Sequence, residues 1–293
     1  MDNRFIRLVQ IMPYMQKKPV SNTFSDAGAL YDFMGSAPIA FDTRNDTSLV
    51  NLGYWKGLNP FAKEDLYRSN HALFNLVGQN AQLSAQDDLV ADIGCGLGTG
   101  TVLFAVNFKC PRVIGINISK YQIEQSRQRV IRQNLEKEVE IHNMSATELQ
   151  FPDNSVDKMI TTEAAFHFDS RENFFREAFR TLKPGGILSL ADMIYDKPRN
   201  TWENFLLSRL YHSLYIPLSN IYGYLEYLAK VRAAGFKIMA AQNITSYVRP
   251  YFRKFAISHP YTFVFNHKIS WVIANLGFLV YPWEYLYVVA RKP

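Results

Sequence analysis

Four glycines at alternate positions, Gly94, Gly96, Gly98 and Gly100, follow an acidic residue, Asp92. An apolar run precedes them, and residues compatible with a helix come after them. Glycines at this density let the backbone turn sharply and approach a ligand closely. A strand that enters a glycine-rich turn before a helix is the way open α/β sheets build nucleotide sites. The run therefore predicts a site for an adenosine-containing cofactor.

The glycine-rich pattern of dinucleotide-binding proteins, G-x-G-x-x-G, is only partly present. Gly94 and Gly96 fit it, but Thr99 stands where the third glycine belongs. The next apolar run, residues 113–116, ends at Asn117, where a dinucleotide site would have an acid for the ribose. Both departures disfavour an NAD-dependent oxidoreductase.

Two titratable residues, Glu163 and His167, follow the apolar run 158–161. Active sites of open α/β sheets lie beyond the carboxyl ends of the strands, so we expect both side chains near the reacting atoms. Because they are four residues apart, they would share one face of a helical turn. A neutral histidine there could take a proton from a hydroxyl group. The alternative, a His167 that merely packs against a helix, stays open.

Further segments agree with the glycine run, in a consistent order along the chain. Together they resemble the class I S-adenosylmethionine (SAM) dependent methyltransferases that act on small molecules and lipids. The sequence Asp92-x-Gly94-x-Gly96-x-Gly98 resembles the first motif of that family. The other segments that resemble it are residues 31–32, 51–55, 116–122, 145–157, 182–186 and 288–293.

The resemblance implies SAM as the cofactor, with S-adenosylhomocysteine as its product. The glycine loop would wrap the methionine part, whose carboxylate is favoured at a helix N-terminus. Aromatic side chains of the segment 51–55 would flank the sulfonium, since a cation is attracted to aromatic faces. The expected cofactor-binding residues are Tyr31, Tyr54, Trp55, Asp92, Gly94, Cys95, Gly96, Gly98, Thr99, Asn117, Ile118, Gln122, Ser145, Ala146 and Glu163.

The chain departs from the family pattern at three places. Ser145 stands where an aspartate usually contacts the adenine amino group, and Asn117 replaces the acid on the ribose. A hydroxyl and an amide can make these hydrogen bonds without charge. Asn51 and Leu52 stand where the family has a histidine before its Gly-Tyr-Trp element.

Apolar runs rich in β-forming residues alternate with helical patterns, which predicts a parallel sheet wound with helices on both faces. We expect an α/β protein with a Rossmann-like, seven-stranded, doubly wound sheet and helical cap insertions. The expected strands are residues 89–93, 113–116, 139–141, 158–161, 187–191, 236–240 and 285–290, and the expected helices are residues 101–107, 120–134, 171–181 and 224–234.

We divide the chain into four parts. Residues 1–75 form an N-terminal cap segment and lid, and residues 76–194 form the SAM-binding α/β core. Residues 195–235 form a cap insertion and a helix, and residues 236–293 form the C-terminal part of the sheet with an aromatic cap segment. Aromatic residues make up 14% of the chain, and in the resembled family insertions at these places cap the active site.

The composition excludes several classes. Lysine and arginine exceed aspartate and glutamate by only six and are scattered, so nucleic acid is a poor candidate partner. The histidines and the two cysteines show no metal-ligand spacing, so we expect no metal. Two cysteines also argue against a disulfide framework and favour the cytoplasm. No window holds the ~18 apolar residues that a membrane span needs.

The first 20 residues combine apolar side chains with arginine and lysine. They lack the long apolar run and cleavage site of a signal peptide. A cap helix packed on the protein is the favoured interpretation. The alternative is a basic amphipathic helix that contacts a membrane at the periphery.

We expect an enzyme that transfers a methyl group from SAM to a small hydrophobic acceptor, such as a polyketide, a terpenoid or a lipid-like alcohol. O-methylation is favoured because His167 could remove the hydroxyl proton. C-methylation of an isoprenoid or sterol-like substrate, with Glu163 steadying a cation, and N-methylation of a small amine are the alternatives. A non-catalytic SAM-binding module is disfavoured because the glycine loop is intact. The oligomeric state is not predicted.

Overall fold

The computed structural model describes most of the sheet and its helices. It covers residues 27–36, 51–198, 215–250 and 283–293, together with Asn200, Thr201, Glu203, Asn204, Ser208 and Tyr211. The expectations for the basic N-terminal segment, for the aromatic stretch 251–282 and for much of the insertion 199–214 lie outside the described residues.

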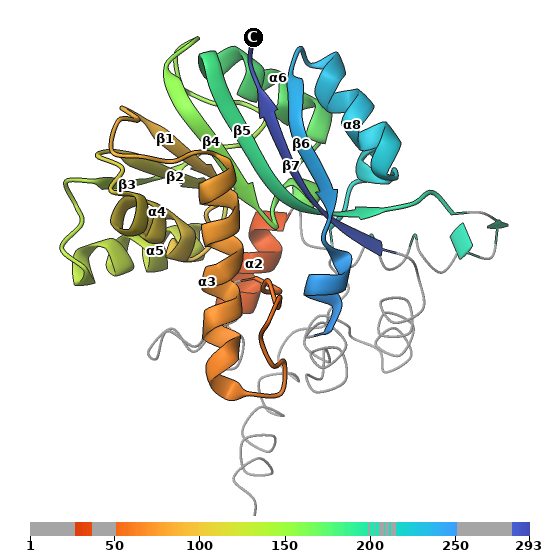
Figure 1. The fold of residues 1–293 in the computed structure, drawn as a ribbon, viewed down its shortest axis with the longest axis horizontal. Coiled ribbons are helices and arrows are strands. Elements are labelled where there is room, and N and C mark those ends of the chain that lie inside the picture. Colours follow the sequence, from red (N-terminus) through yellow and green to blue (C-terminus); the bar gives the residue numbers. More distant parts are fainter. Residues whose placement is uncertain are drawn as a thin grey trace, which may run out of the picture.

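A mixed seven-stranded sheet forms the centre of the molecule (Figure 1). Its order is β3-β2-β1-β4-β5-β7-β6. The first five strands run parallel, and β7 is antiparallel to both of its neighbours. The strands are Val90–Ile93 (β1), Val113–Asn117 (β2), Val139–Asn143 (β3), Val156–Thr162 (β4), Leu182–Tyr195 (β5), Lys237–Asn243 (β6) and Trp283–Arg291 (β7). The predicted doubly wound sheet is therefore confirmed.

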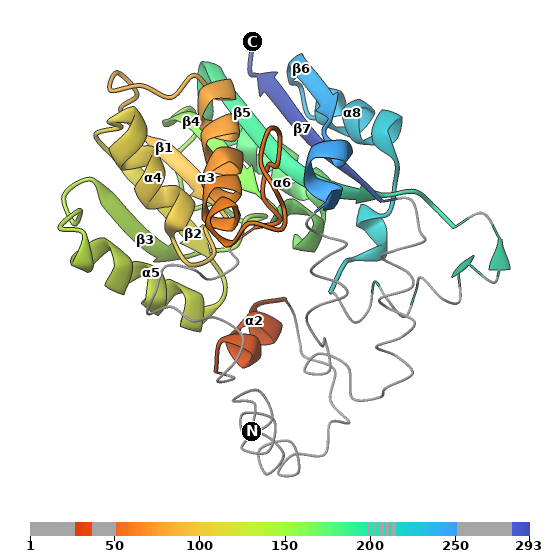
Figure 2. The ribbon, with the colours of Figure 1, turned by 60° about the horizontal axis from the view of Figure 1, so that its bottom comes forward.

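Helices cover both faces of the sheet, as the two views in Figures 1 and 2 show. The helices α3, α4 and α5 pack on one face, and α6 and α8 pack on the other, so the sheet separates two hydrophobic clusters. The helices are Ala27–Ser36 (α2), Lys63–Asn80 (α3), Thr99–Phe108 (α4), Lys120–Arg132 (α5), Arg171–Thr181 (α6) and Tyr224–Ala233 (α8), with 3-10 turns at Ala165–His167 (η1) and Leu218–Asn220 (η2).

The strand β5 is much longer than its apolar run predicted. Every residue from Ile187 to Tyr195 pairs with a residue of β7, so the long-range partner, and not the local pattern, sets the length. Residues 182–186, one of the segments that carry the family resemblance, lie in its first part. Gly185 has a φ of +82° there, and its amide donates to the carbonyl of Lys292 at 2.9 Å.

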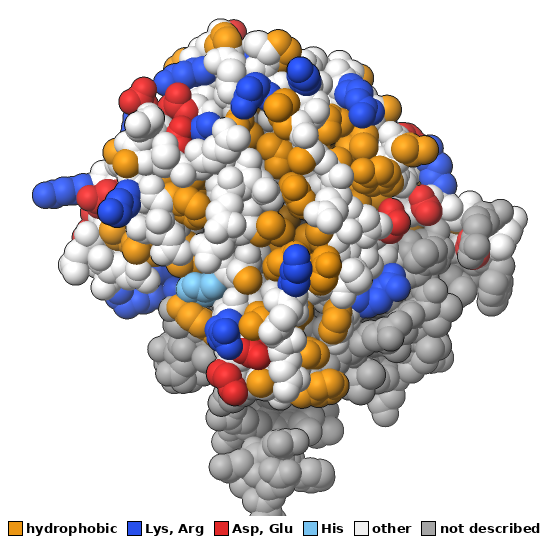
Figure 3. Space-filling view, in the orientation of Figure 1, with side chains coloured by type: hydrophobic (Ala, Val, Ile, Leu, Met, Phe, Trp, Pro, Cys, Tyr) orange, Lys and Arg blue, Asp and Glu red, His pale blue; other side chains and the backbone are white. Residues whose placement is uncertain are grey.

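The face shown in Figure 3 carries hydrophobic side chains over its middle, and its lysines and arginines are scattered across it. This distribution agrees with the scattered basic residues of the sequence. Among the residues that the structure describes, no helix is long and apolar enough to cross a membrane.

Glycine and phenylalanine alternate across the contact between α3 and α4. A Cβ atom built on Gly100 would lie 2.6 Å from Cε1 of Phe74, and one built on Gly78 would lie 2.6 Å from Cε2 of Phe108. Each helix therefore presents a glycine to a ring of the other helix. This contact places α4, and with it the glycine-rich turn at its start, against α3.

The replacement Gly100→Ala should lower the free energy of unfolding by about 1–3 kcal/mol, because the added methyl group overpacks the Phe74 ring. In an open helix the same change would raise stability by about 1 kcal/mol, so the sign of the effect reports the contact. Urea denaturation measures it. The control Gln128→Ala, on the exposed side of α5, should stay within about 0.5 kcal/mol of the parent. A stabilised Gly100→Ala protein would contradict the expectation.

Candidate functional site

The predicted site residues gather at the carboxyl ends of the parallel strands. β1 has β2 on one side and β4 on the other, so the chain winds away from β1 in opposite directions. In open α/β sheets this switch point is where ligands bind. The helix α2 lies at the same end of the sheet (Figure 2).

The glycine loop after β1 is held by the end of β2. The backbone amides of Gly94 and Cys95 both donate to the carbonyl of Ile116 at 2.9 Å. Next along the loop, the carbonyl of Gly96 accepts from Nδ2 of Asn117 at 3.3 Å. The glycine loop is therefore held by Ile116 and Asn117, which begin the segment 116–122 and lie about 20 residues later in the sequence.

The helix α5 holds the other side of the loop. Oγ of Ser126 donates to the carbonyl of Gly96 at 2.9 Å, and Nε of Arg129 donates to the carbonyl of Leu97 at 3.1 Å. Both side chains are buried. The sequence interpretation assigned no role to either, because they sit in an ordinary helical pattern.

The three glycines that begin the loop need their residue type for different reasons. All have left-handed φ values, +73° at Gly94, +55° at Gly96 and +75° at Gly98. A Cβ on Gly94 would meet Cβ of Ala164 at 2.4 Å, and one on Gly98 would meet Cβ of Ser126 at 3.0 Å. On Gly96 a Cβ would meet no atom within 4 Å. Gly96 therefore leaves its backbone open to a ligand, as the predicted cofactor requires.

Polar groups flank this opening at the start of α4. Asp92 is buried and accepts from Oγ1 of Thr101 at 2.6 Å, and its burial raises the pKa of its carboxyl to about 7. Oγ1 of Thr99, in the first turn of α4, is buried and has no hydrogen-bond partner among the described residues. A helix N-terminus with a spare hydroxyl suits a carboxylate, so the site fits the methionine end of SAM.

The end of β2 carries a second set of polar groups. Asn117 accepts from the backbone amide of Ile118 at 2.8 Å and donates to Oε1 of Gln122 at 2.8 Å. Gln122 lies in the first turn of α5, whose N-cap is Ser119. Asn117 and Gln122 therefore stand together where the resemblance expects the ribose.

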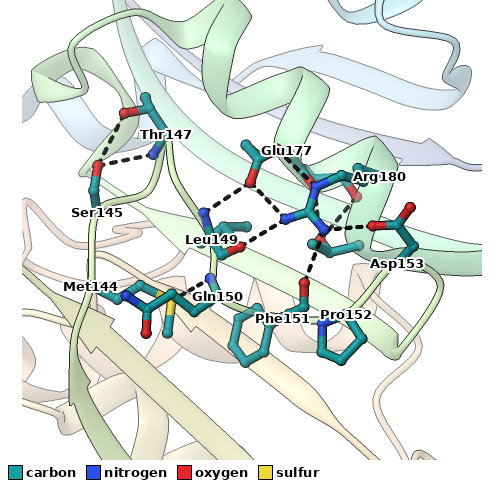
Figure 4. A network of polar contacts seen from close by, with 12 residues as sticks. Met144, Ser145, Thr147, Leu149, Gln150, Phe151, Pro152, Asp153, Glu177 and Arg180 are labelled. Atoms are coloured by element: carbon teal, nitrogen blue, oxygen red, sulfur yellow. Dashed lines mark hydrogen bonds and ion pairs between the residues drawn. The ribbon is translucent and has the colours of Figure 1, made fainter.

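The loop after β3 carries Ser145 and Ala146. Oγ of Ser145 lies 3.0 Å from Oγ1 of Thr147 and also accepts from the Thr147 amide, so it stabilises its own turn. Arg180 of α6 anchors the rest of the loop, donating to the carbonyls of Leu149 at 2.7 Å and Phe151 at 3.0 Å (Figure 4). The contact of Ser145 with adenine stays a prediction, and Arg180 is an anchor that the sequence did not reveal.

The segment 51–55 is fixed between α3 and the end of β4. The side chains of Asn51 and Asn70 exchange hydrogen bonds with each other's carbonyls, at 3.2 and 2.8 Å. Nε1 of Trp55 donates to the carbonyl of Leu52 at 2.8 Å, and Trp55 is buried. Tyr54 is partly exposed. Asn51, which stands where the family has a histidine, therefore holds the segment against Asn70 of α3.

Glu163 lies immediately after β4 with a φ of +53°. Its Oε1 accepts from the Leu52 amide at 2.9 Å and from the Tyr285 hydroxyl at 2.8 Å. Burial raises the pKa of this carboxyl to about 7. The prediction that Glu163 and His167 share one face of a helical turn is wrong, because the 3-10 turn η1 begins only at Ala165 and Glu163 belongs to the left-handed bend before it.

His167 has a polar partner on each ring nitrogen. Its Nδ1 lies 3.2 Å from the carbonyl of Tyr215, and its Nε2 lies 3.0 Å from the hydroxyl of Tyr31. A carbonyl can only accept, so Nδ1 carries the proton and Nε2 of the neutral ring accepts from Tyr31. Burial, together with the charge of Glu163, raises the pKa of Tyr31 to about 12, so its hydroxyl stays protonated.

Asp32, next to Tyr31, joins α2 to the cofactor side of the site. Its Oδ1 accepts from Oγ of Ser119 at 2.6 Å and from the Tyr121 amide at 3.0 Å, at the start of α5. The sequence singled out the Tyr-Asp pair by resemblance. The contacts show that the two residues reach opposite sides of the site.

The structure therefore brings most of the predicted residues to one end of the sheet. Tyr215, Tyr285 and Asn70 also contribute, and each lies far in the sequence from the residue that it contacts. Among the described residues there is no group of three or more histidine, cysteine, aspartate or glutamate side chains that could hold a metal ion.

Comparison with known proteins gives a consistent result. Residues 91–190 match the model of a methyltransferase domain. The chain is 28% identical to erythromycin 3''-O-methyltransferase of Saccharopolyspora erythraea over 69% of this chain and 66% of the relative. It is 31% identical to sterol 24-C-methyltransferase erg6 of Aspergillus fumigatus over 53% of this chain and 41% of the relative.

Two solved structures share the fold. The [4+2]-cyclase SpnF superimposes with a TM-score of 0.73 and 22% identity, covering 94% of this chain and 98% of that one. Geranyl diphosphate C-methyltransferase from Streptomyces coelicolor A3(2), in complex with S-adenosylhomocysteine, gives 0.66 and 20%, covering 78% and 82%. Residues 91–190 therefore form a methyltransferase domain, and its glycine loop with the polar groups around it fits SAM as the cofactor.

Proposed function

We propose that the enzyme methylates a hydroxyl group of a small hydrophobic acceptor. The observation that carries the proposal is the contact between Tyr31 and His167 at the carboxyl end of β4. This contact gives the proton of an acceptor hydroxyl a path to His167. Methylation of an amine or of a carbon does not remove a hydroxyl proton and has no need of that path. The relative named as an O-methyltransferase supports the same reaction type.

The acceptor is hydrophobic. One cluster of buried apolar side chains extends to the end of the sheet where His167 lies, and it contains Phe166, Met193, Tyr195, Tyr211 and Trp283. Sites for small molecules are mostly lined by apolar and aromatic side chains with a few polar groups that fix orientation. Tyr31, Glu163 and His167 are the polar groups of this kind.

SAM supplies an electrophilic methyl group, so the protein has to align the acceptor oxygen and accept its proton. The acceptor hydroxyl donates to the oxygen of Tyr31, and the Tyr31 hydroxyl donates to Nε2 of His167. As the acceptor oxygen is alkylated, its proton moves to Tyr31 and the Tyr31 proton moves to the lone pair of Nε2. The proton ends on Nε2 of His167, while Nδ1 keeps its own proton and donates to the carbonyl of Tyr215. His167 remains the base expected from the sequence, with Tyr31 as the group between it and the acceptor.

Glu163 has a different part in this proposal. Its Oε1 ties the segment 51–55 to the end of β4, because it accepts from the Leu52 amide and from the Tyr285 hydroxyl. When ionised, it is an anion beside the place where the cationic cofactor binds. Asp92, Thr99, Asn117 and Gln122 hold the rest of the cofactor.

C-methylation of a sterol-like or isoprenoid substrate is the second candidate. The sterol C-methyltransferase relative favours it, and so does Glu163, because a buried carboxylate can steady a cation on carbon. Incubation with labelled SAM and matched panels of alcohols, alkenes and amines separates the candidates. Label transfer to alkenes alone would refute the hydroxyl proposal.

We also propose a cytoplasmic location. Both cysteines, Cys95 and Cys110, are free and buried. Free thiols are typical of a reducing compartment. Contact of the N-terminal segment with a membrane stays the alternative.

The replacement Gly96→Val should weaken binding of S-adenosylhomocysteine by more than about tenfold, about 1.4 kcal/mol at 25 °C. Its side chain would enter the space that Gly96 leaves open. The matched control is Gly185→Val, because Gly185 also has a left-handed φ and no atom within 4 Å of a Cβ. Isothermal calorimetry measures both. Equal losses in the two variants would mean that backbone strain, and not cofactor contact, explains the effect.

The replacements Tyr31→Phe and His167→Ala should each lower turnover by roughly 100- to 10,000-fold, the range typical of general base catalysis. The affinity for S-adenosylhomocysteine should change less than about threefold. Tyr224→Phe is the control, since among the described residues its hydroxyl donates to the carbonyl of Ala241, away from His167. Turnover of Tyr31→Phe at a third of the parent value or more would exclude the relay.

SAM carries one more positive charge than S-adenosylhomocysteine, so the ratio of their affinities reports an anion beside the sulfonium. The pKa of Glu163 is raised to about 7, so the carboxylate forms as the pH rises through 7. The preference for SAM should therefore grow roughly tenfold between pH 6 and pH 8, as expected for partly buried charges. Glu163→Gln keeps an oxygen for Leu52 and Tyr285 and should flatten the profile. A ratio that does not depend on pH in the parent enzyme would contradict the placement of Glu163.

A further inference from the structure

The turn that carries His167 is held from both sides by one side chain. Nδ2 of Asn220 donates to the carbonyl of Phe166 at 3.2 Å and to the carbonyl of Phe168 at 2.8 Å. These two residues flank His167 in the chain. Asn220 is fully buried, so its amide has no competing water.

The same asparagine is itself fixed by α6. Its Oδ1 accepts from the backbone amide of Arg171 at 3.0 Å, and its carbonyl accepts from the Arg171 guanidinium at 2.6 Å. The oxygen and nitrogen of its amide therefore both have partners, which fixes the orientation of the side chain. The guanidinium also donates to Asp192 at 2.8 Å, and Oδ1 of Asp192 accepts from the Phe166 amide at 3.2 Å.

The segment that brings Asn220 also supplies the partner of the histidine ring. Tyr215 lies five residues before Asn220, and its carbonyl meets Nδ1 of His167 at 3.2 Å. Tyr215 has a φ of +52°, which is unfavourable for an aromatic residue. Such a conformation persists only where the surroundings impose it. The short stretch 215–220 therefore supplies both the Tyr215 carbonyl that faces the His167 ring and the Asn220 side chain that holds the turn.

We propose that Asn220 is a positioning residue for methyl transfer, which holds the 166–168 turn so that His167 keeps Nδ1 on the Tyr215 carbonyl and presents Nε2 to Tyr31. The inference rests on the proposed function, in which Nε2 of His167 receives the acceptor proton. Without the clamp the ring has no fixed relation to the Tyr215 carbonyl. The neutral ring then populates both tautomers, and Nε2 is protonated and unable to accept in one of them.

The test reads the tautomer directly. The full chain is labelled with ¹⁵N-histidine, and the signals of His167 are assigned by comparison with His167→Gln. At pH 8 the parent enzyme should show a protonated Nδ1 and an unprotonated Nε2. In Asn220→Ala the two nitrogen signals should move toward each other, and kcat should fall at least about tenfold while the KM for SAM stays within about threefold.

The control removes a hydrogen bond from the same buried cluster without touching the turn. The hydroxyl of Tyr227 donates to Oδ2 of Asp192 at 3.2 Å, so Tyr227→Phe should lower stability but leave the His167 signals and kcat close to the parent. Asn220→Asp serves if the alanine variant does not fold, because it keeps the oxygen for Arg171 and loses the two donated hydrogen bonds. It should shift the tautomer in the same way.

Unchanged His167 signals in a folded Asn220 variant would overturn the proposal, as would an equal shift in Tyr227→Phe. A shifted tautomer with undiminished turnover would support Asn220 as the residue that fixes the ring and would instead refute the proposed role of His167. The two failures are therefore distinguishable.

Discussion

An ion pair buried between α6 and β5 holds together the end of the sheet where His167 lies. Arg171 is completely buried, Asp192 is 1% exposed, and Nε of Arg171 lies 2.8 Å from Oδ2 of Asp192. Charges removed from water are tolerated only when their remaining polar atoms are also satisfied. The guanidinium meets this requirement with the carbonyls of Met193 and Asn220 and lies over the rings of Tyr222 and Tyr227. The elements α6, β5, η2 and α8 are tied to one charge pair in this way.

That demand for satisfied charges explains what holds the turn that carries His167 in place. The 3-10 segment η1 is only one turn long, so it makes few hydrogen bonds within itself. Its amide and carbonyl groups find their partners in Asp192 and Asn220. The cost of burying the ion pair is thus offset by contacts that also order the residues around His167.

The sheet and the glycine loop could be predicted from the sequence because their signals are local. A buried parallel strand has a continuous apolar run, and a left-handed turn needs glycine, so β1 and the residues after it could be recognised without any partner. The end of β5 could not be predicted in this way, because the length of that strand depends on its pairing with β7, about 90 residues later in the chain.

The polar contacts of the site were largely beyond prediction for the same reason. Tyr31 and His167 are 136 residues apart, and Glu163 and Tyr285 are 122 apart. Asn220 and Arg180 lie in patterns that look like ordinary turn and helix. Residue type showed which groups could do chemistry, but only the folded chain shows which groups face each other.

The [4+2]-cyclase SpnF shares the fold of this chain. One sheet with one cofactor loop can serve different reactions, because the groups that meet the second substrate come from other elements. In the reaction proposed for this chain, those elements are α2, the end of β4 and the segment 215–220. Under that proposal they, and not the glycine loop, would set the reaction type.

The two neighbouring residues Tyr31 and Asp32 have a consequence for the timing of the catalytic cycle. Tyr31 reaches His167, and Asp32 reaches Ser119 at the start of α5. Adjacent residues of one helix move as a rigid body, so a displacement of α2 that frees one contact also strains the other. If the acceptor and the cofactor bind as proposed, release of the methylated product and exchange of the spent cofactor would both accompany the same displacement of α2.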